Sequence, residues 1–205
     1  MTWKAVDAAE TFKNREKMME MLIKAAVVFL SRSENLSDDM MTRGVEMIAD
    51  IVKVDKFSVW RNSTMPDGLR TSQIYRWNRE FGAVPPIPSL QNVSYSKFAM
   101  PLEEVFEKGE SLNYRVSLLP DNSILKQHGV KSAFITPIFV GNALWGLVLF
   151  ADSRSEHHFD DISVEMMRSA AFLVANTVIR TEMEREIRDE NKLNRVMFED
   201  RKSTR

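Results

Sequence analysis

The chain has 205 residues, of which 44% are hydrophobic and 28% are charged, so it can build a sizeable core and is not disordered throughout. Its 28 Lys and Arg residues nearly balance its 29 Asp and Glu residues, and no net field favours nucleic acid or an anionic membrane. Cysteine is absent, which excludes disulfides, thiolate metal sites, cysteine nucleophiles and thioether-linked chromophores.

The first part of the chain has the pattern of two amphipathic helices. Apolar residues recur at three- and four-residue steps from about residue 8 to residue 31, and no Gly or Pro interrupts them. Residues 31–37 break this pattern. A second helix follows, with Ser37 as its expected N-cap and an apolar stripe formed by Met41, Val45, Ile48, Ala49 and Val52.

The middle of the chain alternates strands, turns and short helices. Residues 56–62 and 69–77 are strand candidates, and the Met-Pro-Asp-Gly sequence at 65–68 predicts a hairpin turn between them. Residues 82–92 hold three of the seven prolines and are expected to form a loop. Short helices are predicted at 102–108, between Pro101 and Gly109, and within 118–128.

A second hairpin and one long helix complete the chain. Residues 131–140 and 143–152 are strongly apolar strand candidates, and Gly141–Asn142 predicts a two-residue turn. Pro137 has no amide proton, so we expect it where the ladder needs no donor. From Asp160 or Asp161 a helix of about 40 residues, or about 60 Å, is predicted. It is apolar on one face up to Val178 and charged beyond, so its end cannot fold back wholly onto so small a domain.

Residues 132–180 resemble the C-terminal half of a GAF domain. The similarity rests on an ordered series of positions, namely Pro137, Ile138, Gly141, Trp145, Gly146, Asp152, Phe159 and Asp160, followed by a long helix. It extends over about residues 36–180. The resemblance implies an α+β fold with an antiparallel sheet of five or six strands. Amphipathic terminal helices would cover one face, and short helices and loops the other; a PAS-like fold is the alternative.

The resemblance also implies an organisation and a role. We divide the chain into an N-terminal amphipathic helix (1–33), a GAF-like sensor domain (34–180) and a charged exit helix (181–205) that leads to an output domain. Such a module acts in signal transduction, often before a histidine kinase of a two-component system or a diguanylate cyclase. We expect a homodimer whose first and last helices form a four-helix bundle, with the last helix relaying the change.

A small molecule is the expected ligand, and its identity, like that of any cofactor, is left unspecified. Strand alternation places Ser58 and Trp60 together with Asn62, while Tyr75 and Trp77 share a face of the next strand. The proposed ligand-binding residues are Ser58, Trp60, Tyr75, Trp77, Asn78 and Thr136 on the strands, with Phe98, Leu102 and Phe106 as a lid. The alternative is that these aromatic residues fill a core and that the module dimerises or binds a protein partner without a ligand.

No sequence motif indicates catalysis, so we expect no enzymatic activity and no catalytic or metal-binding residues. The adjacent pairs Asp38–Asp39 and Asp160–Asp161 suit helix N-termini better than acid–base chemistry. His157 and His158 are expected in a solvated loop. His128 follows a short predicted helix, where a cation is favourable. Its alternative roles are a polar group of the pocket or an axial ligand, and the latter leaves a haem or metal sensor as a third hypothesis.

The expected location is the cytoplasm. The longest purely apolar run falls far short of the roughly 20 residues that a membrane span needs. The first residues also lack the apolar core of a signal peptide. We therefore expect a soluble piece of a longer protein, with no nucleic-acid partner and no membrane span in this fragment.

Overall fold

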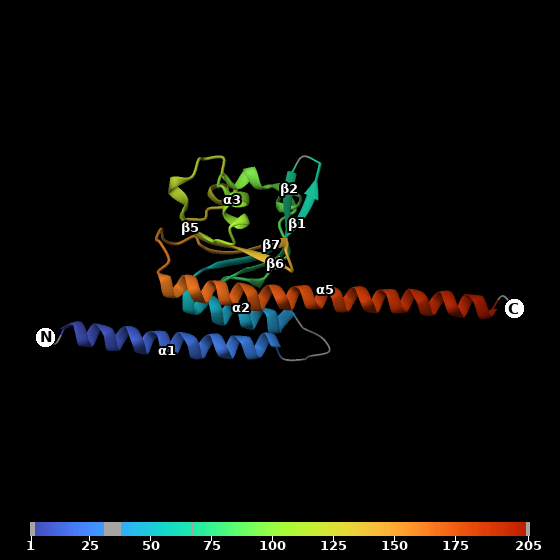
Figure 1. Ribbon diagram of the computed structural model, residues 1–205, viewed down its shortest axis with the longest axis horizontal. Coiled ribbons are helices and arrows are strands. Elements are labelled where there is room, and N and C mark those ends of the chain that lie inside the picture. The colour runs from blue at the N-terminus through green and yellow to red at the C-terminus, as the bar shows by residue number, and fades with distance from the viewer. Residues whose placement is uncertain (1–2, 31–37, 67, 204–205) are drawn as a thin grey trace.

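The computed structural model describes residues 3–30, 38–66 and 68–203 (Figure 1). Its helices are α1 (Trp3–Leu30), α2 (Asp38–Val52), α3 (Leu102–Glu107), α4 (Ile124–Gln127) and α5 (Asp161–Ser203). Its strands are β1 (Lys56–Met65), β2 (Gly68–Asn78), β3 (Gly82–Ala83), β4 (Val93–Ser94), β5 (Leu112–Arg115), β6 (Ser132–Val140) and β7 (Ala143–Asp152). Three 3-10 turns, Pro88–Leu90, Tyr95–Phe98 and Val116–Leu118, lie between them.

The strands form one antiparallel sheet of seven, in the order β3-β2-β1-β7-β6-β5, with β4 pairing separately with β2. Both predicted hairpins, β1–β2 and β6–β7, are present, and β7 lies between β1 and β6 at the centre. The α+β class and the antiparallel arrangement are therefore confirmed. The sheet has more strands than expected because β3 and β4, of two residues each, pair with β2: β3 lies in the predicted loop 82–92, and β4 directly follows that loop.

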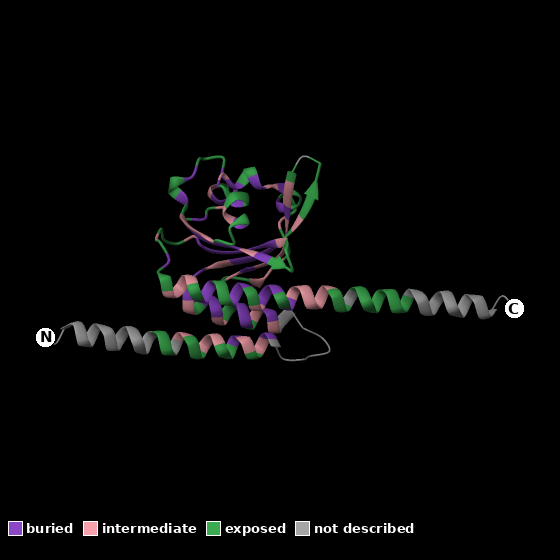
Figure 2. Ribbon diagram, viewed as in Figure 1, coloured by how far each residue is buried: buried purple, intermediate pink, exposed green. Residues whose placement is uncertain are grey.

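The sheet separates two layers that differ in composition (Figures 1 and 2). Helices α2 and α5 cover one face, and their buried apolar residues pack with Phe57, Val148 and Phe150 of the sheet in a helix-side core. Short helices, 3-10 turns and loops cover the other face and build a second core around Trp60, Phe98 and Leu147. Each sheet strand therefore sends alternate side chains to different cores.

Helix α1 is one layer further from the sheet than we expected of a terminal helix. It packs on α2 and α5, with Ala25 and Phe29 buried in the helix-side core. The carbonyl of Phe29 accepts a hydrogen bond from Arg180 Nη2 at 3.1 Å. Because Arg15 also pairs with Glu165 at 3.7 Å, α1 runs parallel to the first half of α5. The expected cap at Ser37 lies outside the described residues.

Helix α5 has 43 residues, and its first half packs on the rest of the domain. Asp160 caps it, since its Oδ1 accepts a hydrogen bond from Ser163 N at 2.7 Å. Met167, Ala170 and Val174 are buried on the sheet, whereas residues 183–192, apart from 185, are exposed (Figure 2). Within Asp161–Lys192, one window of 18 residues has a mean hydropathy of 1.3, so this helix is long and apolar enough to span a membrane by length and composition alone. Its buried stripe already has a protein partner in the sheet.

Candidate functional site

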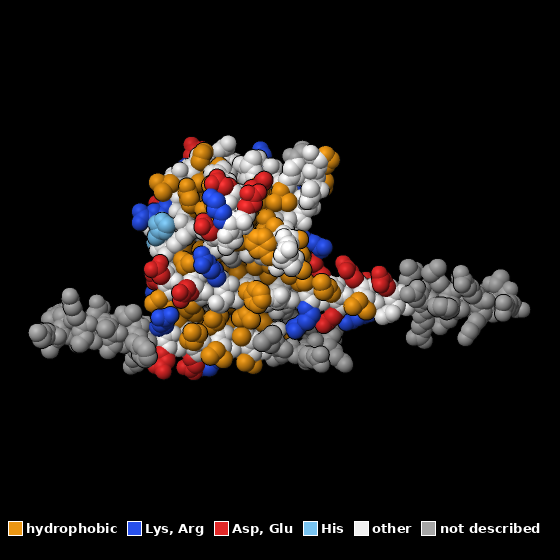
Figure 3. Space-filling view, viewed as in Figure 1, with side chains coloured by type: hydrophobic (Ala, Val, Ile, Leu, Met, Phe, Trp, Pro, Cys, Tyr) orange, Lys and Arg blue, Asp and Glu red, His pale blue; other side chains and the backbone are white. Residues whose placement is uncertain are grey.

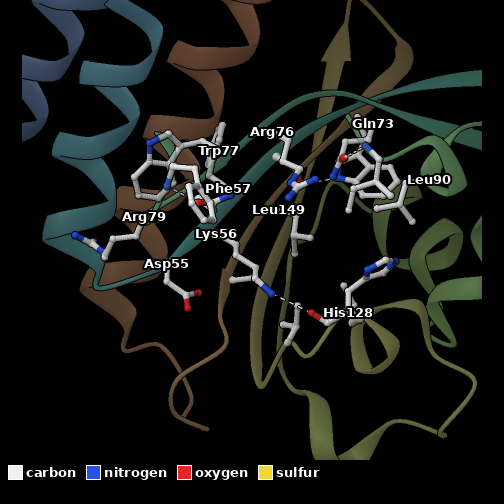
Figure 4. A pocket seen from close by; sticks show the side chains of 18 of the residues that line it. Asp55, Lys56, Phe57, Gln73, Arg76, Trp77, Arg79, Leu90, His128 and Leu149 are labelled. Atoms are coloured by element: carbon white, nitrogen blue, oxygen red, sulfur yellow. Dashed lines mark hydrogen bonds between the residues drawn. The ribbon is translucent and has the colours of Figure 1, made fainter. Parts of the chain in front are cut away.

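A cavity of about 530 Å³ opens between the sheet and the second layer, where β1, β2 and β7 face α4 (Figure 4). The strand register explains which side chains meet there. Lys56 pairs with both Asn78 and Ala151, and Ser58 pairs with both Arg76 and Leu149. Because residues paired across an antiparallel ladder share a face, these two rows lie on the cavity side of the sheet.

Apolar side chains form most of the cavity wall. Leu149 and Ala151 belong to the sheet, and the second layer adds Ile87, Leu90, Ile124, Leu125 and Val130. Trp60 closes the inner end and is 2% exposed; its Nε1 donates to Ser58 Oγ at 2.7 Å, and its ring lies edge-on to Phe98 with centroids 5.6 Å apart. A largely apolar space with a few fixed polar groups is typical of a small-molecule site.

Cationic groups also line the cavity, among them Lys56, Arg76 and His128 (Figure 4). Lys56 Nζ donates to the carbonyl of His128 at 2.9 Å, and Arg76 stands one row further along the sheet. Burial lowers the pKa of Lys56, and the nearby Arg76 lowers it further against the opposing effect of Asp55. Burial, followed by the charges of Lys56 and Arg76, lowers the pKa of His128. His128 does follow α4, but a cation there is disfavoured, contrary to our expectation.

Four of the nine predicted ligand-binding residues border the cavity. They are Ser58, Trp60, Trp77 and Asn78, although the Trp77 side chain packs mainly in the helix-side core. Arg79 lies over the Trp77 ring at 5.8 Å from its centroid. Contact of these residues with a ligand stays a prediction.

The other five predicted residues lie elsewhere. Tyr75 packs against the helix-side core, edge-on to Phe57 with centroids 6.2 Å apart. Phe98, Leu102 and Phe106 are buried inside the second core and do not border the cavity. Thr136 Oγ1 accepts a hydrogen bond from Ser111 Oγ at 2.9 Å, in a shallow groove beside α5. The strand face was misjudged for Tyr75 because a β-bulge changes the alternation: Val59 pairs with Tyr75, but Trp60 pairs with Gln73.

Sequence reasoning missed Lys56, Gln73 and Arg76 as cavity residues, whereas a pocket role for His128 was one of the alternatives. Gln73 is buried, and its Oε1 accepts a hydrogen bond from Ile87 N at 3.0 Å, which fixes the proline-rich loop over the cavity. A signal was present, since Gln73 and Arg76 flank the apolar pair Ile74–Tyr75 in β2. Assigning them to this face required the register of the hairpin, which alternation alone does not supply.

A buried carboxylate holds the segment between the cavity rim and α5. Asp152 Oδ1 accepts from Arg154 N at 2.9 Å and from Arg154 Nε at 3.1 Å, while its Oδ2 accepts from Ser155 Oγ at 2.9 Å. Burial by itself would raise the pKa of Asp152, but these hydrogen bonds and the Arg154 charge lower it overall. Arg154 also lines the cavity, so one side chain touches both the cavity and the connection to α5.

Two further observations concern the histidines and metals. His157 Nδ1 lies 3.3 Å from Ser155 Oγ, and its ring lies edge-on to Phe159 with centroids 4.7 Å apart. In the part of the chain that the structure describes, no three His, Asp or Glu side chains converge as metal ligands.

Comparison with known proteins identifies the family that has this architecture. The family model of the GAF domain matches residues 38–178. The methanogenesis regulatory histidine kinase FilI of Methanothrix harundinacea is 26% identical over 149 residues, which are 70% of this chain. The chain spans only 17% of the length of that kinase.

Solved structures show the same fold. A phycocyanobilin-bound GAF domain from a cyanobacterial phytochrome superposes with a TM-score of 0.56 at 19% identity, covering 82% of this chain and 96% of the other. The GAF domain of an Acinetobacter phosphoenolpyruvate-protein phosphotransferase superposes with a TM-score of 0.56 at 14% identity, covering 80% and 94%.

Proposed function

The chain belongs to the GAF domain family, and from that premise we propose that it is a non-catalytic sensory module whose cavity binds a small molecule. One observation carries the proposal. The second core is filled by large side chains except at the cavity of about 530 Å³, where polar and cationic side chains converge on an apolar space. That volume lies within the range of about 300–1,000 Å³ typical of ligand pockets.

The signalling context of the proposal comes from the relative. FilI is a histidine kinase, and its similarity to this chain supports a kinase-type output domain joined to a charged exit helix. In this proposal residues 1–33, 34–180 and 181–205 are the terminal helix, the sensor and the connection to that output, and the protein works in the cytoplasm. The absence of cysteine means that a bilin, which some solved GAF domains carry, has no thioether anchor here.

The same proposal includes a route from the cavity to α5. Arg154 borders the cavity, bonds to Asp152 at the end of β7 and donates from Nη2 to the carbonyl of Lys53 at 2.9 Å. The chain then leads through a short segment to α5. A ligand that binds one arrangement of this segment better than another by about 1.4 kcal/mol shifts the two populations tenfold.

A screen of small metabolites by thermal unfolding tests the binding part of the proposal. A compound at a hundredfold excess over its Kd stabilises the fold by about 2.7 kcal/mol, which raises the Tm of a domain of this size by about 5–10 °C. In Leu149→Trp, whose added ring fills the cavity from the sheet, the same compound is expected to have little effect. Leu144→Trp, on the same strand but outside the cavity, should respond like the wild type. A library without any stabilising compound, or stabilisation that persists in Leu149→Trp, would contradict the proposal.

We also propose that the module is a homodimer formed by α1 and α5. Met19 and Ile23 on α1 are 53% and 59% exposed, and Phe172 on α5 is 63% exposed. Figure 3 shows that apolar side chains gather over this pair of helices. Because α1 runs parallel to α5, these residues lie at similar levels along the two helices, and a second copy would bury them in a four-helix bundle.

Light scattering tests the dimer. We expect about twice the chain mass of 23.7 kDa at micromolar concentration. The double variant Ile23→Glu/Phe172→Glu should be monomeric, because burying two carboxylates in an apolar interface is costly. Leu118→Glu, an equally exposed apolar position in the second layer, should stay dimeric. A wild-type mass of one chain across the concentration range would refute this part of the proposal.

A further inference from the structure

We propose that the cavity selects an organic oxyanion, a compact apolar molecule that carries one carboxylate or phosphate group, and that Lys56 and Arg76 bind this group. The inference rests on the proposed function, since it names the chemical class of the ligand for the same cavity. It starts from an imbalance of charge around the site.

Five cationic or potentially cationic side chains border the cavity, and only two of them have a carboxylate partner. Arg79 pairs with Asp50, and Arg154 pairs with Asp152 at 3.1 Å. Among the described residues, no carboxylate lies within 4.0 Å of the charged groups of the other three, Lys56, Arg76 and His128. Asp55, next to Lys56, already accepts a hydrogen bond from Ser153 N at 2.9 Å, and Glu80 is exposed at the rim.

Lys56 and Arg76 also keep most of their hydrogen-bonding capacity. The ammonium of Lys56 has three donors, of which one is directed to the His128 carbonyl. The guanidinium of Arg76 has five, and its protein contact is a long one, from Nη1 to the Pro85 carbonyl at 3.5 Å. Both side chains are partly buried. Partly buried cations normally have a partner, so the unused donors indicate that an external anion supplies it.

The two cations raise the local potential for one another. Each lies close enough to His128 to lower the pKa of its imidazole, after the larger effect of burial. The pKa of Lys56 is lowered first by burial and then, to a smaller extent than Asp55 raises it, by Arg76. A bound oxyanion would relieve this repulsion, and the low dielectric of a closed cavity would strengthen the attraction.

A buried hydroxyl adds a third donor. Ser58 is 4% exposed and pairs with Arg76 in the β1–β2 ladder. Its Oγ accepts from Trp60 Nε1, so its own proton is available to donate. Lys56, Ser58 and Arg76 thus present donors along neighbouring positions of the sheet. Leu149 and Ile124, which line the same cavity, offer an apolar surface for the rest of the molecule.

Paired probes test this assignment on the full chain. Phenylacetate and phenyl phosphate carry an oxyanion, and phenylacetamide has the same body without charge. Thermal shift and ligand-observed NMR at concentrations up to about 10 mM should give at least a tenfold tighter Kd for an anionic probe than for the amide. The preference should be lost in Arg76→Gln and in Lys56→Gln. Arg115→Gln, an exposed arginine at the opposite edge of the sheet, should keep it.

The outcomes separate the two proposals. If phenylacetate prevails, the group is a carboxylate, and if phenyl phosphate prevails, it is a phosphate; both support an oxyanion site. Equal binding of the amide would show a cavity that does not select anions. A preference retained in both cavity variants would show that Lys56 and Arg76 do not bind the anionic group. If neither anionic probe binds, the oxyanion assignment is wrong, and the metabolite screen still decides independently whether the cavity binds neutral compounds.

One readout needs no ligand. In the free protein, Arg76→Gln should raise the pKa of His128, followed by the NMR shift of the imidazole protons, because one of the two charges that lower it is removed. Arg115→Gln should leave that pKa where it is. An unchanged His128 pKa in Arg76→Gln would show that the cationic field is absent and would overturn the inference.

Discussion

Gly146→Ala is expected to destabilise the domain by about 3 kcal/mol or more, at the upper end of what overpacking costs. A Cβ atom at this position would lie 2.0 Å from the carbonyl oxygen of Trp60 and 3.3 Å from the Cα of Arg61. Both neighbours are backbone atoms of β1, so no rotation of a side chain can relieve the clash. The added methyl would therefore push β1 from β7 at the centre of the sheet, next to the bulge that directs Trp60 towards the second core.

Denaturant unfolding measures this effect directly. The control is Gly109→Ala, where φ is +70° but nothing lies within 4 Å of the new Cβ. That variant should lose only the roughly 1 kcal/mol that a left-handed backbone conformation costs a residue with a side chain. Equal losses for the two variants would show that β1 and β7 do not approach as closely as described.

Phe29→Ala is expected to cost about 3–5 kcal/mol, the usual range for removing a buried phenyl ring. The Phe29 ring covers Gly44 of α2 so closely that a Cβ there would lie 2.3 Å from the ring Cζ. It is 1% exposed, and its carbonyl bonds to Arg180 of α5. Phe29→Ala keeps this backbone carbonyl but removes the ring that packs on Gly44 and in the helix-side core, so α1 should separate from the domain more readily.

Hydrogen exchange distinguishes release of α1 from loss of the whole fold. Amides of residues 18–29 should exchange much faster in Phe29→Ala, while those of β6 and β7 should stay protected in proportion to the remaining stability. Lys24→Ala, at an exposed polar position of the same helix, should leave exchange within α1 nearly unchanged. Unaltered protection of α1 in Phe29→Ala would mean that other contacts hold this helix.

Elements with a strong local signal were predictable from the sequence. Strand β7 agrees with its predicted range of 143–152, because an apolar run next to a two-residue turn has few alternatives. The long helix from Asp161 followed from an uninterrupted apolar face and an acidic start. The two-residue strands β3 and β4 had no such signal, since they exist only by pairing with β2.

The site was less predictable, because it depends on register and layer rather than on local pattern. Ser58, Trp60 and Asn78 were selected from alternation and border the cavity, whereas the bulge after Val59 reversed the face expected for Tyr75. Phe98 and Phe106 were predicted to form a lid over the ligand, but they fill the second core. Alternation within single strands could not predict that Lys56 and Arg76 lie close together, because only the pairing of β1 with β2 brings them to adjacent rows of the sheet.

The central claim is that a small molecule bound between the sheet and α4 changes α5. Amide ¹H–¹⁵N NMR of the protein, saturated with the most stabilising compound of the metabolite screen, tests it most directly. We expect shifts at the cavity residues of β1, β2 and β7, continuing through residues 152–160 into the packed half of α5. Shifts confined to the groove between Ser111 and Phe172, or to the surface of α1, would contradict both the site and the route to the exit helix.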